Sequence, residues 1–272
     1  MKYIQIAPSG AIWIGGIVAE HALIRTRALS IAFGGNWAVN TVDLDVWPYT
    51  LKSIIGPNGA GKTTFFNLIS GQYKPSSGQI LFRGRDISGL GAADRTRLGI
   101  GRSFQLTNIF PNLSVLENVR LALQSKQGLG WIFWRHVRAY SELEDRAYTL
   151  LQEVLLEKRW NEEAINLSHG EQRKLEIAIL LALDPELLLL DEPTAGMSQE
   201  EVPAILEIIQ GIKAAKERTL LLVEHKFDMV MALSDSIAVL KDGRLVCDDV
   251  PEAVVQNQEV QAAYLGGGAT HD

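Results

Sequence analysis

Nine consecutive residues have the composition and spacing of a loop that binds phosphate. Residues 56–64 read GPNGAGKTT, which fits G-x-x-x-x-G-K-[ST], and they lie between an apolar run and a helical pattern. Glycines let successive backbone N–H groups point inward, and the start of the helix adds positive potential. We expect Lys62 to reach the β- and γ-phosphates of a nucleotide, Thr63 to bind Mg²⁺ and Thr64 to contact the α-phosphate. The residues predicted to bind nucleotide here are Gly56, Asn58, Gly59, Ala60, Gly61, Lys62, Thr63 and Thr64.

Two carboxylates close an apolar strand farther along the chain. Four leucines at 187–190 are followed by Asp191 and Glu192. The C-terminal end of a buried parallel strand opens onto the ligand crevice, so we expect Asp191 to bind Mg²⁺ through water. Because side chains alternate along a strand, Glu192 is expected to point the other way, as the base for the attacking water. On its own such a pair is also typical of a solvated strand end, but beside a phosphate loop it indicates catalysis.

A histidine ends the next apolar strand, in Val223-Glu224-His225. A lone histidine is more often an ordinary surface or core residue. Its place at a strand end, beside the acid pair, favours a catalytic role. We expect His225 to hydrogen-bond the γ-phosphate and the attacking water.

The elements that must hold these groups follow a repeated order of strand, loop and helix. Apolar runs that predict strands lie at 51–55, 79–82, 187–190 and 219–223. Helical patterns lie at 63–70, 118–159, 166–183 and 200–215. Antiparallel strands are expected over 23–46 and 237–246, around Gly34-Gly35 and Asp242-Gly243. This order predicts an α/β fold: a P-loop core of mainly parallel strands with an antiparallel β part and a helical part.

Composition narrows the class of protein. The chain has 272 residues and a formal net charge of −6, so a general basic surface for nucleic acid is missing. Its single cysteine, Cys247, excludes an intramolecular disulfide and suits a reducing compartment. No apolar run is long enough to predict a transmembrane helix, and residues 11–19 come nearest. We expect residues 1–22 to be an N-terminal extension, with a cleaved signal peptide as the alternative.

Two further segments join the phosphate loop and the acid pair in a fixed order. Gln105 ends the segment RSFQ, and residues 167–172 read LSHGEQ. With LDEP at 190–193 and His225 downstream, this order resembles the ATPase subunits of ABC transporters. The LSHGEQ segment distinguishes this family from other P-loop proteins, because nucleotide kinases and GTPases lack it. The resemblance implies the ABC ATPase fold over residues 23–266, with a helical subdomain at about 105–184 inserted and a disordered tail at 267–272.

The resemblance also implies a dimer that sandwiches two ATP molecules. Each ATP would be held by the phosphate loop of one chain and by the LSHGEQ segment of the other, whose helix start forms a second anion site. That segment contributes Ser168, His169, Gly170 and Glu171. The implied catalytic residues are Glu192, His225 and Gln105, and the implied metal ligands are Thr63, Gln105 and Asp191. Phe33 would stack on adenine, with Trp37 as a rival, and Ser198 replaces the Asp usual at its position.

A narrower resemblance rests on FGG at 33–35, KLEIA at 174–178, VEH at 223–225 and VQAAYLG at 260–266. These segments are similar to ATPases of branched-chain and hydrophobic amino acid uptake, with urea and short-amide uptake ATPases close by. The implied partners are transmembrane permeases, a second ATPase copy or paralogue and, indirectly, an extracytoplasmic solute-binding protein. The implied location is the cytoplasmic face of the membrane, as a peripheral subunit. Urea or amide uptake, lipid or lipopolysaccharide export, and a soluble ABC ATPase are the alternatives.

Overall fold

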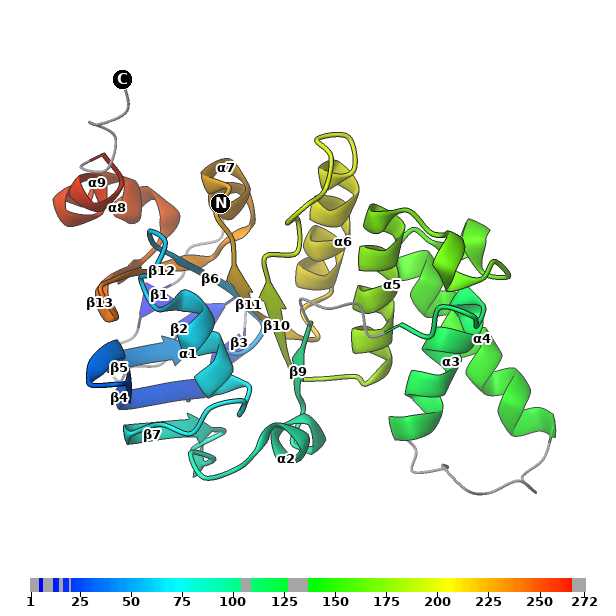
Figure 1. The fold of residues 1–272 in the computed structure, drawn as a ribbon, viewed down its shortest axis with the longest axis horizontal. Helices are drawn as coiled ribbons and strands as arrows, with labels where there is room; N and C mark the ends of the chain where they lie inside the picture. The colour runs from blue at the N-terminus through cyan, green and yellow to red at the C-terminus, as the bar shows by residue number, and fades with distance from the viewer. Residues whose placement is uncertain are drawn as a thin grey trace.

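The computed structural model describes residues 5–6, 12–14, 17–19, 21–103, 109–126 and 137–265. A six-stranded sheet runs through the centre of this part of the chain (Figure 1). Its strands, in spatial order, are β13 (Arg244–Asp249), β12 (Ser236–Lys241), β6 (Leu51–Ile55), β11 (Thr219–Val223), β10 (Leu187–Asp191) and β9 (Ile100–Arg102). All neighbours pair in parallel except β13, which is antiparallel to β12. The parallel core with an antiparallel edge agrees with the predicted α/β class.

The leucine run of β10 is buried on both faces of this sheet. Leu188 and Leu190 pack into one core, with residues of the covering helices α5 (His169–Ala182) and α6 (Val202–Ala215). Leu187 and Leu189 face a second core on the opposite side. A strand covered on both faces has no polar side, which explains why its sequence is continuously apolar.

The second core joins the central sheet to an antiparallel one. That sheet has the order β5 (Asn36–Val46), β4 (Ile24–Phe33), β7 (Ser77–Phe82), β8 (Arg85–Asp86). Helix α1 (Lys62–Ile69) contributes Phe65, Phe66 and Leu68 to the same core. Because α1 is packed between the two sheets, its start is held firmly at the end of β6. Three short strands, β1 (Gln5–Ile6), β2 (Ile12–Ile14) and β3 (Ile17–Ala19), form a separate antiparallel sheet within residues 1–22.

The helical part lies to one side of the central sheet (Figure 1). It contains α3 (Val115–Lys126) and α4 (Val137–Glu153), and both contact α5. The helical pattern predicted at 118–159, which has a Gly-Leu-Gly break at 128–130, therefore contains two helices, and residues 127–136 between them lie outside the described part. After α4, Leu155 takes a left-handed conformation at φ 55°, and two 3₁₀ turns, η1 (Glu157–Arg159) and η2 (Ala164–Asn166), lead into α5.

Several short elements had no strong sequence signal. They are α2 (Ala92–Arg97), α7 (Phe227–Leu233), α8 (Pro251–Gln256) and α9 (Gln258–Leu265). Among the described residues, no helix is both long and apolar enough to cross a bilayer. The predicted boundaries of the ATPase domain and of its helical insert stay predictions.

Candidate functional site

The segment 56–64 forms the turn between β6 and the start of α1, as the sequence predicts. Gly61 immediately precedes the helix with φ 97°, in the left-handed region that favours glycine. A Cβ on Gly61 would overlap the backbone carbonyl oxygen of Ala38, so the loop also needs a residue without a side chain there. The loop borders a cavity of about 220 Å³. The cavity is lined by Ala38, Asn58, Gly59, Ala60, Gly61, Lys62, Thr63, Thr64, Glu192 and His225.

Lys62 is folded into its own loop. Its Nζ donates to the carbonyl oxygens of Gly56 at 2.7 Å and Pro57 at 3.0 Å, and the residue is 6% exposed. Burial lowers the pKa of this ammonium group, and the negative charges of Glu192 and Asp191 act in the opposite direction. The positive charge of Lys62 is thus kept at the loop by the carbonyl groups of the same loop.

Asp191 ends β10 and is fully buried. Its Oδ2 accepts from Nη2 of Arg102 at 2.8 Å, and Nη1 of Arg102 donates to Ser70 Oγ at 2.9 Å and to Asn67 Oδ1. The other oxygen, Oδ1, is buried and has no hydrogen-bond partner in the described part of the chain. A buried carboxylate oxygen with no partner suits a ligand that brings positive charge or a bound water.

Glu192 does not continue the strand. Its φ of 47° puts it in the left-handed region, so its direction is set by a turn after β10 and the expectation of simple strand alternation was wrong. Its Oε1 lies 2.8 Å from Nε2 of His225, which follows β11 by two residues. A strained non-glycine backbone held by its surroundings is common at functional sites. The structure therefore brings together the predicted base and the predicted histidine.

A buried carboxylate that we did not predict holds this arrangement. Glu224 accepts from Thr194 through both the backbone N–H and Oγ1, at 3.1 and 2.6 Å. Its second oxygen accepts the backbone N–H of His225 at 2.9 Å. Glu224 thus ties the turn after Glu192 to the end of β11. Its position between Val223 and His225 was the available signal, but an acid at a strand end is usually exposed.

The LSHGEQ segment forms the start of α5. Ser168 is the N-cap: its Oγ accepts the backbone N–H of Glu171 at 3.2 Å, while Glu171 Oε2 accepts the backbone N–H of Ser168 at 2.9 Å. Glu171 also pairs with Arg159 at 3.0 Å. Ser168 and His169 are exposed and Gly170 is buried. None of these four segment residues lines the cavity at the phosphate loop.

Arg173, on α5, connects the two sites. Its Nη2 donates to the carbonyl oxygens of Asp191 at 3.1 Å and Glu192 at 3.2 Å, and its Nη1 to Glu176 Oε2 at 2.6 Å. Burial raises the pKa of Glu176, and Arg173 opposes that rise. Arg173 and Arg102 were both missed as site residues, because each acts on a loop far away in the sequence.

Three other predicted positions have different outcomes. Phe33 is 47% exposed and packs edge-on against Tyr73, with 5.4 Å between ring centroids, while Trp37 is 51% exposed. Both aromatic rings are therefore accessible for stacking, to a similar extent. Gln105 lies outside the described residues.

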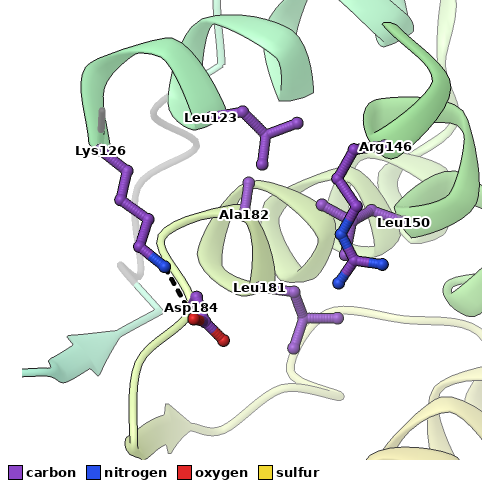
Figure 2. A pocket seen from close by; sticks show the side chains of 7 residues that line it. All are labelled: Leu123, Lys126, Arg146, Leu150, Leu181, Ala182 and Asp184. Carbon is purple, nitrogen blue, oxygen red and sulfur yellow. Dashed lines mark hydrogen bonds and ion pairs between the residues drawn. The ribbon is translucent and has the colours of Figure 1, made fainter. Parts of the chain in front are cut away.

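A second cavity lies between α3, α4 and the end of α5 (Figure 2). Its volume is about 310 Å³, and Lys126 donates to Asp184 at 2.7 Å beside it. The lining residues are Leu123, Lys126, Arg146, Leu150, Leu181, Ala182 and Asp184. None of them is a predicted site residue.

The fold and the site define a P-loop nucleotide-binding protein in which the start of α5 does not line the cavity at the phosphate loop. Residues 39–195 match the ABC transporter family. The branched-chain amino acid transport ATP-binding protein LivG of Escherichia coli K12 is 41% identical over 90% of this chain and 98% of its own length. LivG of Archaeoglobus fulgidus is 34% identical over 90% and 95%. The chain belongs to the ABC transporter family, as one of its ATP-binding subunits.

Solved structures agree with this assignment. The ADP conformation of an ATP-binding cassette of an ABC transporter matches with a TM-score of 0.77 and 27% identity, covering 90% of this chain and 99% of that one. A dimeric cassette in a post-hydrolysis state bound to ADP and Pi matches with a TM-score of 0.70 and 26% identity, covering 84% and 98%. The predicted ABC ATPase fold is confirmed, and nucleotide binding and ATP hydrolysis follow from the family.

Proposed function

We propose that this chain hydrolyses ATP to energise the uptake of branched-chain amino acids. The proposal is supported by LivG and by BraF of Pseudomonas aeruginosa, a branched-chain amino acid transport ATP-binding protein that is 37% identical over 90% of this chain. Its partners are a pair of transmembrane permeases, a second ATPase copy or paralogue and, indirectly, a solute-binding protein. It works as a peripheral subunit at the cytoplasmic face of the membrane.

Two copies are needed to complete one nucleotide site. The observation that carries this part is the separation of the two anion sites: Lys62, Thr63, Glu192 and His225 line one cavity, and the start of α5 contributes nothing to it. In the dimer, Ser168 and the Gly170 N–H of one copy face the γ-phosphate held by Lys62 of the other. The γ-phosphate makes contacts to both copies only when the dimer is closed, so ATP shifts the population to that state.

Magnesium fits the residues that are present. Asp191 offers a buried oxygen without a partner, and Thr63 offers a hydroxyl at the edge of the loop cavity. Among the described residues, no three His, Cys, Asp or Glu side chains gather as a metal cluster. Two protein groups plus phosphate oxygens and water are how Mg²⁺ is usually held. When bound, the ion would neutralise charge on the β- and γ-phosphates.

The chain's own residues supply the proton chemistry. Glu192 is the acceptor that orients and deprotonates the attacking water, and His225, at 2.8 Å, fixes the direction of its carboxylate and contacts the γ-phosphate. Glu224 keeps both loops in place. Phe33, with Trp37 as the rival, stacks on adenine.

The test is Glu192→Gln, which keeps the shape of the side chain and removes the basic oxygen. Turnover should fall by about 10²–10⁴-fold, the range for a general base, while ATP still binds. Glu207→Gln, an exposed change on α6, is the matched control and should hydrolyse ATP like the unsubstituted chain. Steady-state phosphate release and equilibrium ATP binding are measured. Turnover of Glu192→Gln equal to that of the control would show that the base is elsewhere.

The transported solute needs a separate measurement. The whole transporter, purified through a tag on this chain, should contain two permeases and a protein that binds leucine, isoleucine or valine. Recovery of a urea- or amide-binding protein, or of an exporter without a binding protein, would replace the amino acid assignment. Either result would leave the ATPase assignment unchanged.

A further inference from the structure

A carboxylate of the same chain already lies at the start of α5. Oε1 of Glu201 accepts the backbone N–H of Gly170 at 3.2 Å and the hydroxyl of Ser168 at 3.3 Å. Glu201 comes 31 residues after Gly170 and caps no part of its own helix α6 with its side chain. Both donors belong to the LSHGEQ segment. The two groups proposed to receive a γ-phosphate therefore bind a different anion in the single chain.

The geometry around Gly170 shows how close this approach is. A Cβ at Gly170 would lie 2.5 Å from Oε1 and 2.8 Å from Cδ of Glu201. Only glycine leaves room for the carboxylate at this point. The space that a phosphate oxygen needs to reach the Gly170 N–H is the space that Glu201 fills.

Ser198 holds the other half of the carboxylate. Oε2 of Glu201 accepts the backbone N–H and the hydroxyl of Ser198, both at 3.1 Å. The Asp that the family usually carries at position 198 would bring a second negative charge against Glu201. Hydrogen bonds from the backbone and side chain of Ser198 are the main cause of a lowered pKa of Glu201, so the group is ionised at neutral pH.

We propose that Glu201 is an internal competitor for the γ-phosphate: it occupies the anion site at the start of α5 in the open chain and must leave when the dimer closes on ATP. This inference rests on the shared-nucleotide dimer proposed above. Two negative groups cannot share one pair of donors, so closure breaks the contacts of Glu201 with Ser168 and Gly170. Glu201 thereby raises the ATP concentration at which the dimer forms.

The opposite role is a structural one, in which Glu201 holds Ser168 and Ser198 in place for the partner's nucleotide. The two roles predict shifts of opposite sign. If Glu201 competes, removing its charge makes closure easier. If Glu201 has the structural role, removing its charge or its side chain makes closure harder.

The experiment uses the full chain with Glu192→Gln, which retains bound ATP, and measures the mass of the species against ATP concentration by light scattering. Glu201→Gln and Glu201→Ala are each added to this background. Glu200→Gln is the matched control, because it removes the same charge from an exposed neighbour. We expect both Glu201 variants to form the dimer at about fivefold lower ATP, at the low end of allosteric coupling, and Glu200→Gln to match its parent.

Each result has a fixed meaning. If the Glu201 variants form the dimer at the same ATP concentration as Glu200→Gln, or at a higher one, Glu201 is not a competitor. That result would leave the proposal of a shared nucleotide unchanged. A parent that forms no dimer at any ATP concentration overturns the shared nucleotide, and the competitor with it. A thermal unfolding curve of Glu201→Gln without nucleotide, close to that of Glu200→Gln, shows that the shift does not come from a damaged fold.

Discussion

The phosphate loop and the start of α5 are both backbone anion sites, yet the single chain fills them in opposite ways. At the loop, the cation Lys62 is turned onto two carbonyl oxygens, and the nearby carboxylate of Asp191 is paired with Arg102. At the start of α5, the N–H group of Gly170 binds the carboxylate of Glu201. At the first site, Lys62 and one oxygen of Asp191 have partners within the chain while the other oxygen of Asp191 has none, whereas the second site already holds an anion.

The difference follows from what surrounds each site. The loop lies between β6 and α1, and the apolar side chains of α1 are buried in the second core, so we expect the loop to keep its shape when no ligand is bound. The start of α5 is exposed at Ser168 and His169 and depends on the capping box and on Glu201. We infer that the loop binds nucleotide first, and that the start of α5 acts later, when a second copy arrives.

The largest expected effect on this comparison comes from a substitution of Arg102 at the loop site. Arg102→Gln removes the cation that balances the fully buried Asp191, and breaking such a pair costs about 3–5 kcal/mol of unfolding free energy. Arg97→Gln, which loses only an exposed pair with Asp94, should cost less than about 1 kcal/mol. Urea unfolding without nucleotide measures both.

A second change to Asp191 tests whether the arginine acts through charge. Adding Asp191→Asn to Arg102→Gln should recover part of the lost stability, because no uncompensated carboxylate is left buried. Equal unfolding free energies for Arg102→Gln and Arg97→Gln would mean that the loop site does not depend on this internal pair.

The order of binding gives the next prediction. In dilute, monomeric protein, Lys62→Ala should weaken binding of a non-hydrolysable ATP analogue by about 10- to 150-fold, the equivalent of a hydrogen bond to a charged group. Ser168→Ala should leave that affinity unchanged, because Ser168 does not line the loop cavity. Titration calorimetry measures both. Equal losses in the two variants would place Ser168 beside the nucleotide of its own chain.

Much of the fold was predictable because its signals are local. The glycines and Lys62 of the loop form one continuous motif, and the apolar run of β10 indicates a strand covered on both faces. The order of elements then gave a parallel core with antiparallel additions. Short elements such as β9, with three residues, carry too little periodicity to be recognised.

The rest of the site depends on pairs that are distant in sequence. Arg102 meets Asp191 across 89 residues, and Glu201 meets Gly170 across 31. No local pattern indicates which of the chain's 32 acidic residues a given donor will bind. The end of the strand before Glu192 was missed for another reason: a left-handed backbone at a non-glycine residue is imposed by the surrounding loops, so strand periodicity does not apply to it.

The smallest expected effect concerns Glu176, the carboxylate that pairs with Arg173 between the two sites. Burial raises the pKa of Glu176 above its ordinary value of 4.5, so the folded chain holds this proton more tightly than the unfolded chain does. The stabilisation is fully present below pH 4.5 and is lost as the pH rises through the folded pKa. Relative to Glu176→Gln, the unsubstituted chain should therefore gain stability as the pH is lowered from neutral towards 4.5.

Urea unfolding of the two proteins at several pH values measures this difference. Glu207→Gln, a substitution at an exposed position, is measured beside them as the control. The gain for Glu176 should amount to about 1.4 kcal/mol for each unit by which its pKa is raised. A difference that stays flat, or that favours Glu176→Gln on acidification, would mean that Arg173 outweighs burial. In that case Glu176 would stay ionised beside Arg173 over the whole pH range measured.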